Sequence, residues 1–217
     1  MDRTGVTSAE HHHQAGSEPG APGPPARRPA GIDGHSAAGK TTLADELAII
    51  LRGSAVRPVL RVMLDHFKRH ADRRMQYPPG SPESYYFEMF DVDAIRDELL
   101  TPLGPGGNRR YRTQIMDFSG RTAIAADRQM ASDNAILIAD GGFPQRPALA
   151  EHWDLRVYLH IEVADVLRRG TIRDQAWMDS AAAAAERYRA GGLPAAGGPQ
   201  PGRTPGSGPP CHRPSRD

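Results

Sequence analysis

Short apolar runs alternate with stretches of helical periodicity through the middle of the chain. Three runs predict β-strands: Val59 to Leu64, Ala135 to Ala139, and Leu155 to Ile161. Their length and composition are typical of parallel strands buried on both faces. Helical spacing relates Val92, Ile95 and Leu99, and helical patterns also span Thr122 to Ser132 and Val163 to Arg173. This alternation predicts an α/β fold with a doubly wound parallel sheet, helices on both faces, and ligands at the carboxyl ends of the strands.

A further helix is predicted from Thr41 to Arg52, with Gly53 as its stop. Its apolar face consists of Leu43, Leu47, Ile50 and Leu51. The strand expected before it, residues 27–33, contains one large apolar side chain, Ile32. We therefore expect this first strand to be either short or disrupted.

Between that strand and that helix lies a complete Walker A loop. It reads Gly34-His35-Ser36-Ala37-Ala38-Gly39-Lys40-Thr41. Glycines let the backbone fold around an anion, Lys40 can reach the β- and γ-phosphates, and the Thr41 hydroxyl can ligate magnesium at a helix N-terminus. We include Thr42 in the nucleotide-binding set. The loop predicts ATP or GTP binding with Mg²⁺, against the alternative of a glycine-rich turn without a ligand.

Composition narrows the possible partners. A chain of 217 residues with 38% hydrophobic residues can form one globular domain with a core. Its formal net charge of +1 gives no global basic field, so we expect neither nucleic-acid nor membrane binding. The single cysteine, Cys211, excludes an internal disulfide. No long apolar run or signal peptide is evident, so we expect a soluble, cytoplasmic protein.

Both ends of the chain differ from its middle. Residues 1–30 are polar and rich in Pro and Gly, and residues 191–217 are mostly Gly, Pro, Arg and Ser, with Leu193 as the only large apolar side chain. Segments of this kind cannot bury enough apolar surface to fold, so we expect both to be disordered. The predicted domain is 31–190, and the abrupt change after it suggests a frameshifted end.

Two acids follow predicted strands. Asp65 ends the run that begins at Val59, and Asp140 closes a Walker-B-like Ile-Leu-Ile-Ala-Asp run. An acid at such a place can take the proton from an attacking hydroxyl or hold magnesium through water. We assign Asp65 to the acceptor side as base or orienter and Asp140 to the metal. The alternative is that either acid caps a loop or helix.

Three arginines follow the last predicted strand. Arg169 and Arg173 are four residues apart and share a helix face, with Arg168 beside them. Together they can close over the phosphates as a cationic lid. A solvated, arginine-rich helix is the alternative.

Taken in order, these segments resemble the uridine kinase family of P-loop nucleoside kinases. The resemblance covers most of Gly31 to Tyr188 and rests on six segments: Gly31-Ile32-Asp33-Gly34 before the Walker loop, Asp65-His66-Phe67 for Asp-x-Phe-Tyr, Phe90-Asp91 before a helix, Asp117-Phe118 for Tyr-Asp-Phe, Asp140-Gly141-Gly142-Phe143 for Glu-Gly-Ile, and Arg168-Arg169 with Arg173-Asp174. It implies transfer of the γ-phosphoryl group of ATP or GTP to the 5′-hydroxyl of uridine or cytidine, with magnesium. It would make Asp65 the base, and Lys40 with the lid arginines the phosphate clamp.

The acceptor pocket departs from the family pattern. Lys68 replaces the tyrosine of Asp-x-Phe-Tyr, Met116 replaces the tyrosine before Asp117, and Arg121 falls where a histidine usually follows. We therefore expect the acceptor to be a nucleoside or, alternatively, a sugar, a pantothenate-like compound or another small hydroxyl compound. A nucleotide-binding protein without catalysis is the remaining alternative. The resemblance also implies a further strand and closing helix after the lid, for which residues 191–217 offer no apolar pattern.

Aromatic residues precede the helical pattern that begins at Val92. Tyr85, Tyr86, Phe87 and Phe90 can stack on a nucleobase, and Glu88 or Asp91 can bind ribose hydroxyls. The alternative is that the aromatic residues belong to the core or staple the helix.

Overall fold

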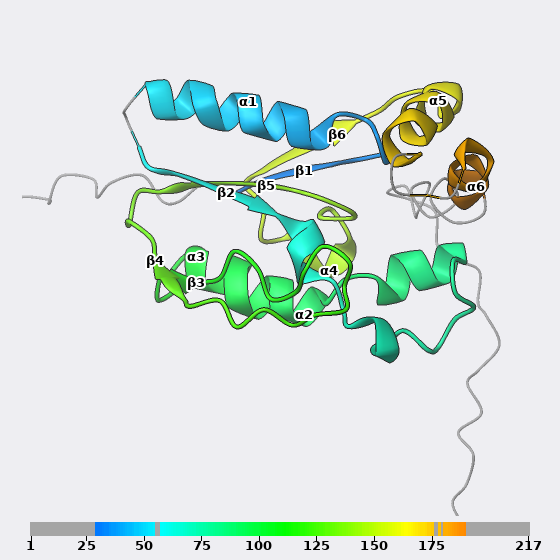
Figure 1. The fold of residues 1–217 in the computed structure, drawn as a ribbon. Coiled ribbons are helices and arrows are strands. Elements are labelled where there is room, and N and C mark those ends of the chain that lie inside the picture. Colours follow the sequence, from blue (N-terminus) through cyan, green and yellow to red (C-terminus); the bar gives the residue numbers. More distant parts are fainter. Residues whose placement is uncertain (1–28, 55–56, 176–177, 179, 190–217) are drawn as a thin grey trace, which may run out of the picture.

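The computed structural model describes residues 29–54, 57–175, 178 and 180–189, which form a layered α/β domain (Figure 1). Its centre is a four-stranded parallel sheet in the order β2-β5-β1-β6. The strands are β1 (Ala30–Gly34), β2 (Val59–Met63), β5 (Ile136–Asp140) and β6 (Leu155–Leu159). Helices cover both faces, so the predicted α/β P-loop fold is confirmed.

The register of the sheet brings the strand ends together. Asp140 of β5 pairs with Ile32 of β1 and with Met63 of β2, while Gly34 pairs with Leu159 of β6. The loops that follow β1, β2 and β5 therefore leave from the same edge, where parallel α/β sheets bind ligands.

Helix α1 (Lys40–Gly53) covers one face. Its buried side chains, Ala44 and Ala48, pack with Ile32, Val59 and Ile138 of the sheet. Leu43, Leu47 and Leu51 join this cluster from the margin. The helix is confirmed, but the assignment of Ile50 to its buried face is wrong, because Ile50 is 67% exposed.

The other face carries the larger core. A helical stretch formed by α2 (Val92–Ile95), η4 (Arg96–Leu100) and α3 (Thr101–Leu103) lies beneath the sheet in Figure 1. Its apolar side chains pack against Val62 and Leu137 of the sheet, together with Phe67 and Phe90. Short turns complete this layer: η1 (Leu64–Phe67), η2 (Ala71–Arg73), η3 (Ser84–Glu88) and α4 (Pro147–Ala150).

The segment Thr122–Ser132 is not the predicted helix. It contains β4 (Gln129–Met130), which pairs antiparallel with β3 (Arg110–Tyr111), and its Ile124 amide donates to the Ile115 carbonyl at 2.9 Å. Its alanines favour a helix locally, but the segment has too few large apolar residues to form a buried helical face. Pairing with an earlier segment satisfies its backbone instead.

The first strand is not disrupted: β1 has five residues, as do β2, β5 and β6, and it pairs with both β5 and β6. Gly31 fits there because a Cβ atom would collide with the Trp153 ring. The last strand departs from the sequence expectation. β6 ends at Leu159 and lies at the edge of the sheet, with Leu155 and Tyr158 exposed, so it is not buried on both faces.

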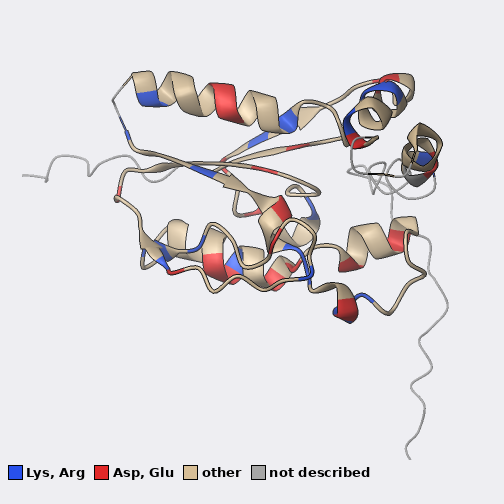
Figure 2. Ribbon diagram, viewed as in Figure 1, with Lys and Arg blue, Asp and Glu red and all other residues tan. Residues whose placement is uncertain are grey.

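Helices α5 (Val163–Asp174) and α6 (Ala181–Arg187) pack together near the carboxyl end of the sheet (Figure 1). Gly170 of α5 allows this approach, since a Cβ atom there would enter the Tyr188 ring. Basic and acidic residues are interspersed along the described ribbon (Figure 2). None of the helices in the described ranges is long and apolar enough to span a membrane. Cys211 and nearly all of both predicted disordered arms lie outside those ranges.

Candidate active site

The Walker A segment forms a tight turn from β1 into α1. Gly34 has a φ of +138°, and a side chain there would strike the Leu159 carbonyl. Gly39, at the N-cap of α1, has a φ of +91°, and Ala37 has a φ of +59°. These left-handed conformations, which glycine adopts without strain, curl the backbone into the shape that an anion-binding loop requires.

Lys40 arches back over this loop. Its Nζ donates to the carbonyls of Gly34 at 3.0 Å and His35 at 2.8 Å. Burial lowers the pKa of the Lys40 ammonium, while the carboxylates of Asp65, Asp33 and Asp140 oppose that shift. The ammonium therefore lies within the field of three acids from three strand ends. It is the cation around which this edge of the sheet is organised.

Thr41 and Asp140 meet directly. The Thr41 Oγ1 donates to Asp140 Oδ2 at 2.7 Å, and Asp140 is 2% exposed. Asp140 Oδ1 lies 2.7 Å from Arg61 Nη1 but has no aligned hydrogen-bond donor. A hydroxyl and a carboxylate with an unfilled lone pair fit Mg²⁺, which takes few protein oxygens and completes its shell with phosphate and water.

Asp65 is in the first turn of η1, directly after β2. It is partly buried and makes no hydrogen bond or ion pair with another described residue. Beside it, the His66 carbonyl accepts from the amides of Ile115 at 3.0 Å and Met116 at 3.1 Å. The segment after Asp65 therefore packs against the loop that contains Ile115, Met116 and Phe118.

The 117–122 turn is fixed by Asp117. Its carboxylate accepts from the Ser119 hydroxyl and from the amides of Thr122 and Arg121, and these bonds lower the pKa of Asp117 to about 2. Asp117 thus fixes the shape of this turn.

The aromatic segment before α2 serves the fold. Tyr85, Tyr86 and Phe90 make edge-to-face ring contacts with Phe143. Phe87, whose side chain is exposed, stacks on the Tyr77 ring.

The two acids suggested for ribose binding are also used by the fold. Glu88 is buried and accepts from the amides of Gln76 and Tyr77, and Asp91 caps α2 by accepting from the Ala94 amide.

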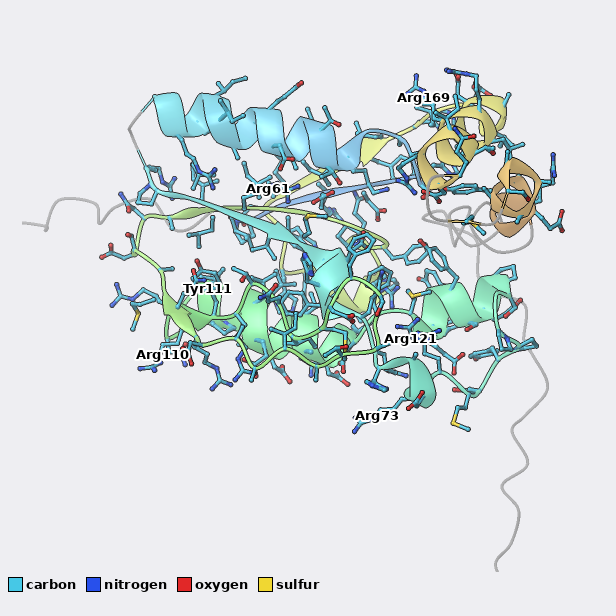
Figure 3. All side chains as sticks on the ribbon, in the orientation of Figure 1. Arg61, Arg73, Arg110, Tyr111, Arg121 and Arg169 are labelled. Carbon is cyan, nitrogen blue, oxygen red and sulfur yellow. The ribbon has the colours of Figure 1, made fainter. Side chains whose placement is uncertain are left out.

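The three lid arginines separate in space. Arg173 Nη2 lies 3.4 Å from the Ser36 Oγ of the Walker loop and 2.7 Å from the Tyr188 hydroxyl. Arg168 instead pairs with Asp165 of its own helix at 2.7 Å. Arg169 is exposed and makes no hydrogen bond or ion pair among the described residues (Figure 3). The structure therefore brings Arg173, but not Arg168 or Arg169, to the loop.

His35 and the end of β6 form an aromatic group beside the loop. The His35 ring makes edge contacts with Tyr158 and His160, and its Nδ1 is buried without a hydrogen-bond partner. Burial, with smaller effects from His160 and from the Lys40 ammonium, lowers the pKa of His35. The neutral imidazole is favoured as a result.

Sequence reasoning missed three charged residues of this region, of which Asp33 and Arg146 are buried and Arg61 is largely buried. Asp33 accepts from the amides of Gly34 and Gln145, and burial raises its pKa. Arg146 donates to the carbonyls of Tyr86 and Phe143. Arg61 contacts Asp140. The sequence does single out Arg61, because it interrupts an otherwise apolar run. Only the fold shows that it forms ion pairs with Asp45 and Asp140.

Two solved structures of other proteins are similar to this one. A provisionally assigned uridine kinase from Bacillus stearothermophilus is similar over 78% of this chain and 79% of its own, with a TM-score of 0.58 and 21% identity. A provisionally assigned fructose transport system kinase from a Silicibacter species is similar over 81% and 85%, with a TM-score of 0.63 and 24% identity. These likenesses establish a shared fold. No curated protein matches the sequence.

The family model of the phosphoribulokinase/uridine kinase family matches residues 30–177. This range runs from β1 through α5 and contains the Walker loop, Asp65, Asp140 and all three arginines of α5. The resemblance drawn from the sequence is thereby confirmed. The chain belongs to the phosphoribulokinase/uridine kinase family and is a P-loop kinase, a class of phosphotransferase that acts on small hydroxyl compounds.

Proposed function

We propose that this kinase transfers the γ-phosphoryl group of ATP, or of GTP, to a small-molecule hydroxyl in the cytoplasm. The leading acceptor is the 5′-hydroxyl of uridine or cytidine. The observation that carries the proposal is the meeting of Lys40, the Thr41–Asp140 pair and the Asp65 carboxylate at one edge of the sheet. Phosphoryl transfer depends mainly on positioning and charge neutralisation, which such a constellation supplies.

Each residue has a defined task in this proposal. The Walker loop and Lys40 hold the phosphates, and Arg173 adds positive charge from the side of Ser36. Thr41 and Asp140 would hold Mg²⁺, which neutralises phosphate charge when bound. Asp65 accepts the proton of the attacking hydroxyl. Its carboxylate is free for that task, since no described residue bonds to it.

A second acceptor class, a hydroxyl compound that carries a phosphate or carboxylate, is favoured by three cations on the segments that follow β2 and β5. Lys68 Nζ lies 4.2 Å from the centre of the Phe118 ring, on the loop that packs against the Asp65 segment. Arg74 and Arg146 have no carboxylate within ion-pair distance among the described residues. Burial lowers the pKa of both guanidinium groups, although the Glu88 charge opposes this shift at Arg74, and Tyr86 and Asp33 oppose it at Arg146. Cations of this kind are suited to an anionic acceptor. The similar Silicibacter protein is provisionally assigned as a fructose transport system kinase, so sugars and their phosphates are included among the acceptors to be tested.

The test is an acceptor panel with γ-labelled ATP, with each product identified by mass. Uridine and cytidine would be compared with matched neutral and charged pairs: fructose against its 1- and 6-phosphates, and glycerol against glycerate. Phosphorylated uridine supports the first acceptor class, and preference for the charged member of a pair supports the second. Nucleotide binding without transfer to any acceptor would instead favour a non-catalytic nucleotide-binding protein.

A further inference from the structure

Arg61 is a largely buried cation of the sheet. It is the third residue of β2, paired in register with Ile138 of β5, and its side chain is 11% exposed. Figure 3 shows it between α1 and the sheet. Arginine at such a place loses hydration and is retained only where other groups compensate its charge.

Two carboxylates provide that compensation. Arg61 Nε donates to Asp45 Oδ1 of α1 at 2.7 Å, and Nη1 lies 2.7 Å from Asp140 Oδ1. Thr41 occupies the other oxygen of Asp140. The carboxylate proposed for magnesium is therefore held from both sides, by a cation at one oxygen and by the Walker threonine at the other.

Arg61 and Asp140 attract each other as an ion pair, but the geometry between them is not that of a hydrogen bond. Asp140 Oδ1 and Arg61 Nη2 are both buried without an aligned hydrogen-bond partner, and Arg61 Nη1 donates to the Val62 carbonyl at 2.8 Å. Asp140 thus keeps a lone pair while part of its negative charge is compensated. Arg61 therefore orients the Asp140 carboxylate. At the same time, the positive charge of Arg61 lowers the affinity of that carboxylate for a divalent metal ion.

We propose that Arg61 is a positioning residue of the metal site that couples divalent-cation binding at Asp140 to nucleotide binding. It directs Asp140 toward Thr41, and its charge disfavours a divalent ion that arrives alone. A nucleotide brings several negative charges to Lys40, so the same ion then binds favourably. The inference rests on the proposed binding of nucleotide and magnesium.

The experiment measures Mn²⁺ binding by electron paramagnetic resonance on the full chain, with and without ADP. Mn²⁺ is the probe because it prefers the same oxygen ligands as Mg²⁺. In the wild-type protein, we expect ADP to strengthen Mn²⁺ binding strongly. In Arg61→Met, nucleotide-free Mn²⁺ binding should tighten by on the order of 10-fold or more, because a positive charge beside Asp140 is removed, so that the dependence on ADP shrinks.

Three further variants separate charge from fold. Arg61→Lys keeps the cation and should retain the strong dependence on ADP even where Arg61→Met fails to fold. Asp45→Asn removes one of the two carboxylates that compensate the charge of Arg61, so Asp140 becomes its only carboxylate partner among the described residues. This variant should bind Mn²⁺ more weakly in the ADP complex. Arg128→Met, which breaks an ion pair with Glu98 on another part of the molecule, should behave as wild type.

Unchanged or weaker nucleotide-free Mn²⁺ binding in folded Arg61→Met overturns the inference, as does unchanged Mn²⁺ affinity in Asp45→Asn. Neither readout requires an acceptor or turnover. A failure of phosphoryl transfer in the wild-type protein would therefore count against the proposed function and leave this measurement intact.

Discussion

Replacing Asp65 by asparagine separates catalysis from nucleotide binding. The substitution keeps the shape of the side chain and removes both its charge and its capacity to accept a proton. Because Asp65 bonds to no other described residue, its loss leaves no hydrogen-bond donor unsatisfied. The main cost is the loss of a negative charge near the buried Lys40, so we expect the free energy of unfolding to fall by on the order of 1 kcal/mol.

The expected effect on turnover is much larger. General-base catalysis typically contributes about 10²- to 10⁴-fold, which corresponds to roughly 3–5 kcal/mol of transition-state stabilisation at about 1.4 kcal/mol per tenfold change. ATP affinity should change little. Asp65 influences Lys40 through its charge, but it lies on the acceptor side of the proposed site. Loss of this carboxylate even favours the approach of phosphates electrostatically.

The assay combines single-turnover transfer, ATP titration by calorimetry and thermal unfolding of Asp65→Asn. A matched control is Asp72→Asn, an exposed acid seven residues later whose contact is a 3.7 Å approach to His70. Equal losses in transfer and ATP affinity would move Asp65 to the magnesium shell. Unchanged transfer would refute its role as base altogether.

Three further outcomes follow from the site. Lys40→Ala should abolish nucleotide-dependent transfer, because it removes the cation that neutralises phosphate oxygens; unchanged turnover contradicts the Walker assignment. Tyr188→Phe should cost about 1–3 kcal/mol in urea unfolding, because Tyr188 donates to the buried carboxylate of Asp174 at 2.6 Å and accepts from Arg173; a loss near zero excludes that network as a stabiliser. The pKa of His35 is lowered from 6.5, so its neutral form stabilises the fold above pH 6.5 and that stabilisation is lost as the pH falls through and below 6.5. His35→Gln should accordingly lose less stability than wild type between pH 7.5 and 5.5, and parallel pH profiles would contradict this.

The local pattern of residue types was sufficient to predict the central strands and the phosphate-binding loop. The runs ending at Asp65 and Asp140 became β2 with its following turn and β5, and the Walker segment became the turn into α1. These elements can be predicted because each depends on residues that are close together in the sequence. The relevant features are the composition of a strand, the conformations open to glycine and the periodicity of a helix. Even so, periodicity misplaced Ile50, since Ala44 and Ala48 provide the close contact with the sheet.

Other features depend on partners far along the chain. The 122–132 segment has a helix-favouring composition, but its backbone pairs with residues 109–116. Trp153 explains the glycine at position 31, a relation that no local pattern reveals. The lid illustrates the same limit: helical spacing places Arg169 and Arg173 on one face, whereas packing of Tyr188 against α5 decides which of them reaches Ser36.

The two halves of the proposed site differ in how they are built, and this has a consequence for the acceptor. The phosphate half is held by contacts within the Walker loop and at the end of β5. The acceptor half is held by backbone bonds between separate loops, such as those from Ile115 and Met116 to the His66 carbonyl and from Ala71 to Gly120. Because those bonds use backbone atoms, side chains such as Lys68 can change while the loops keep their path. Lys40 and Asp65 remain linked through their charges alone. Such an arrangement lets acceptor preference vary without disturbing phosphate binding, so the acceptor must be identified from the side chains around Asp65 and by assay.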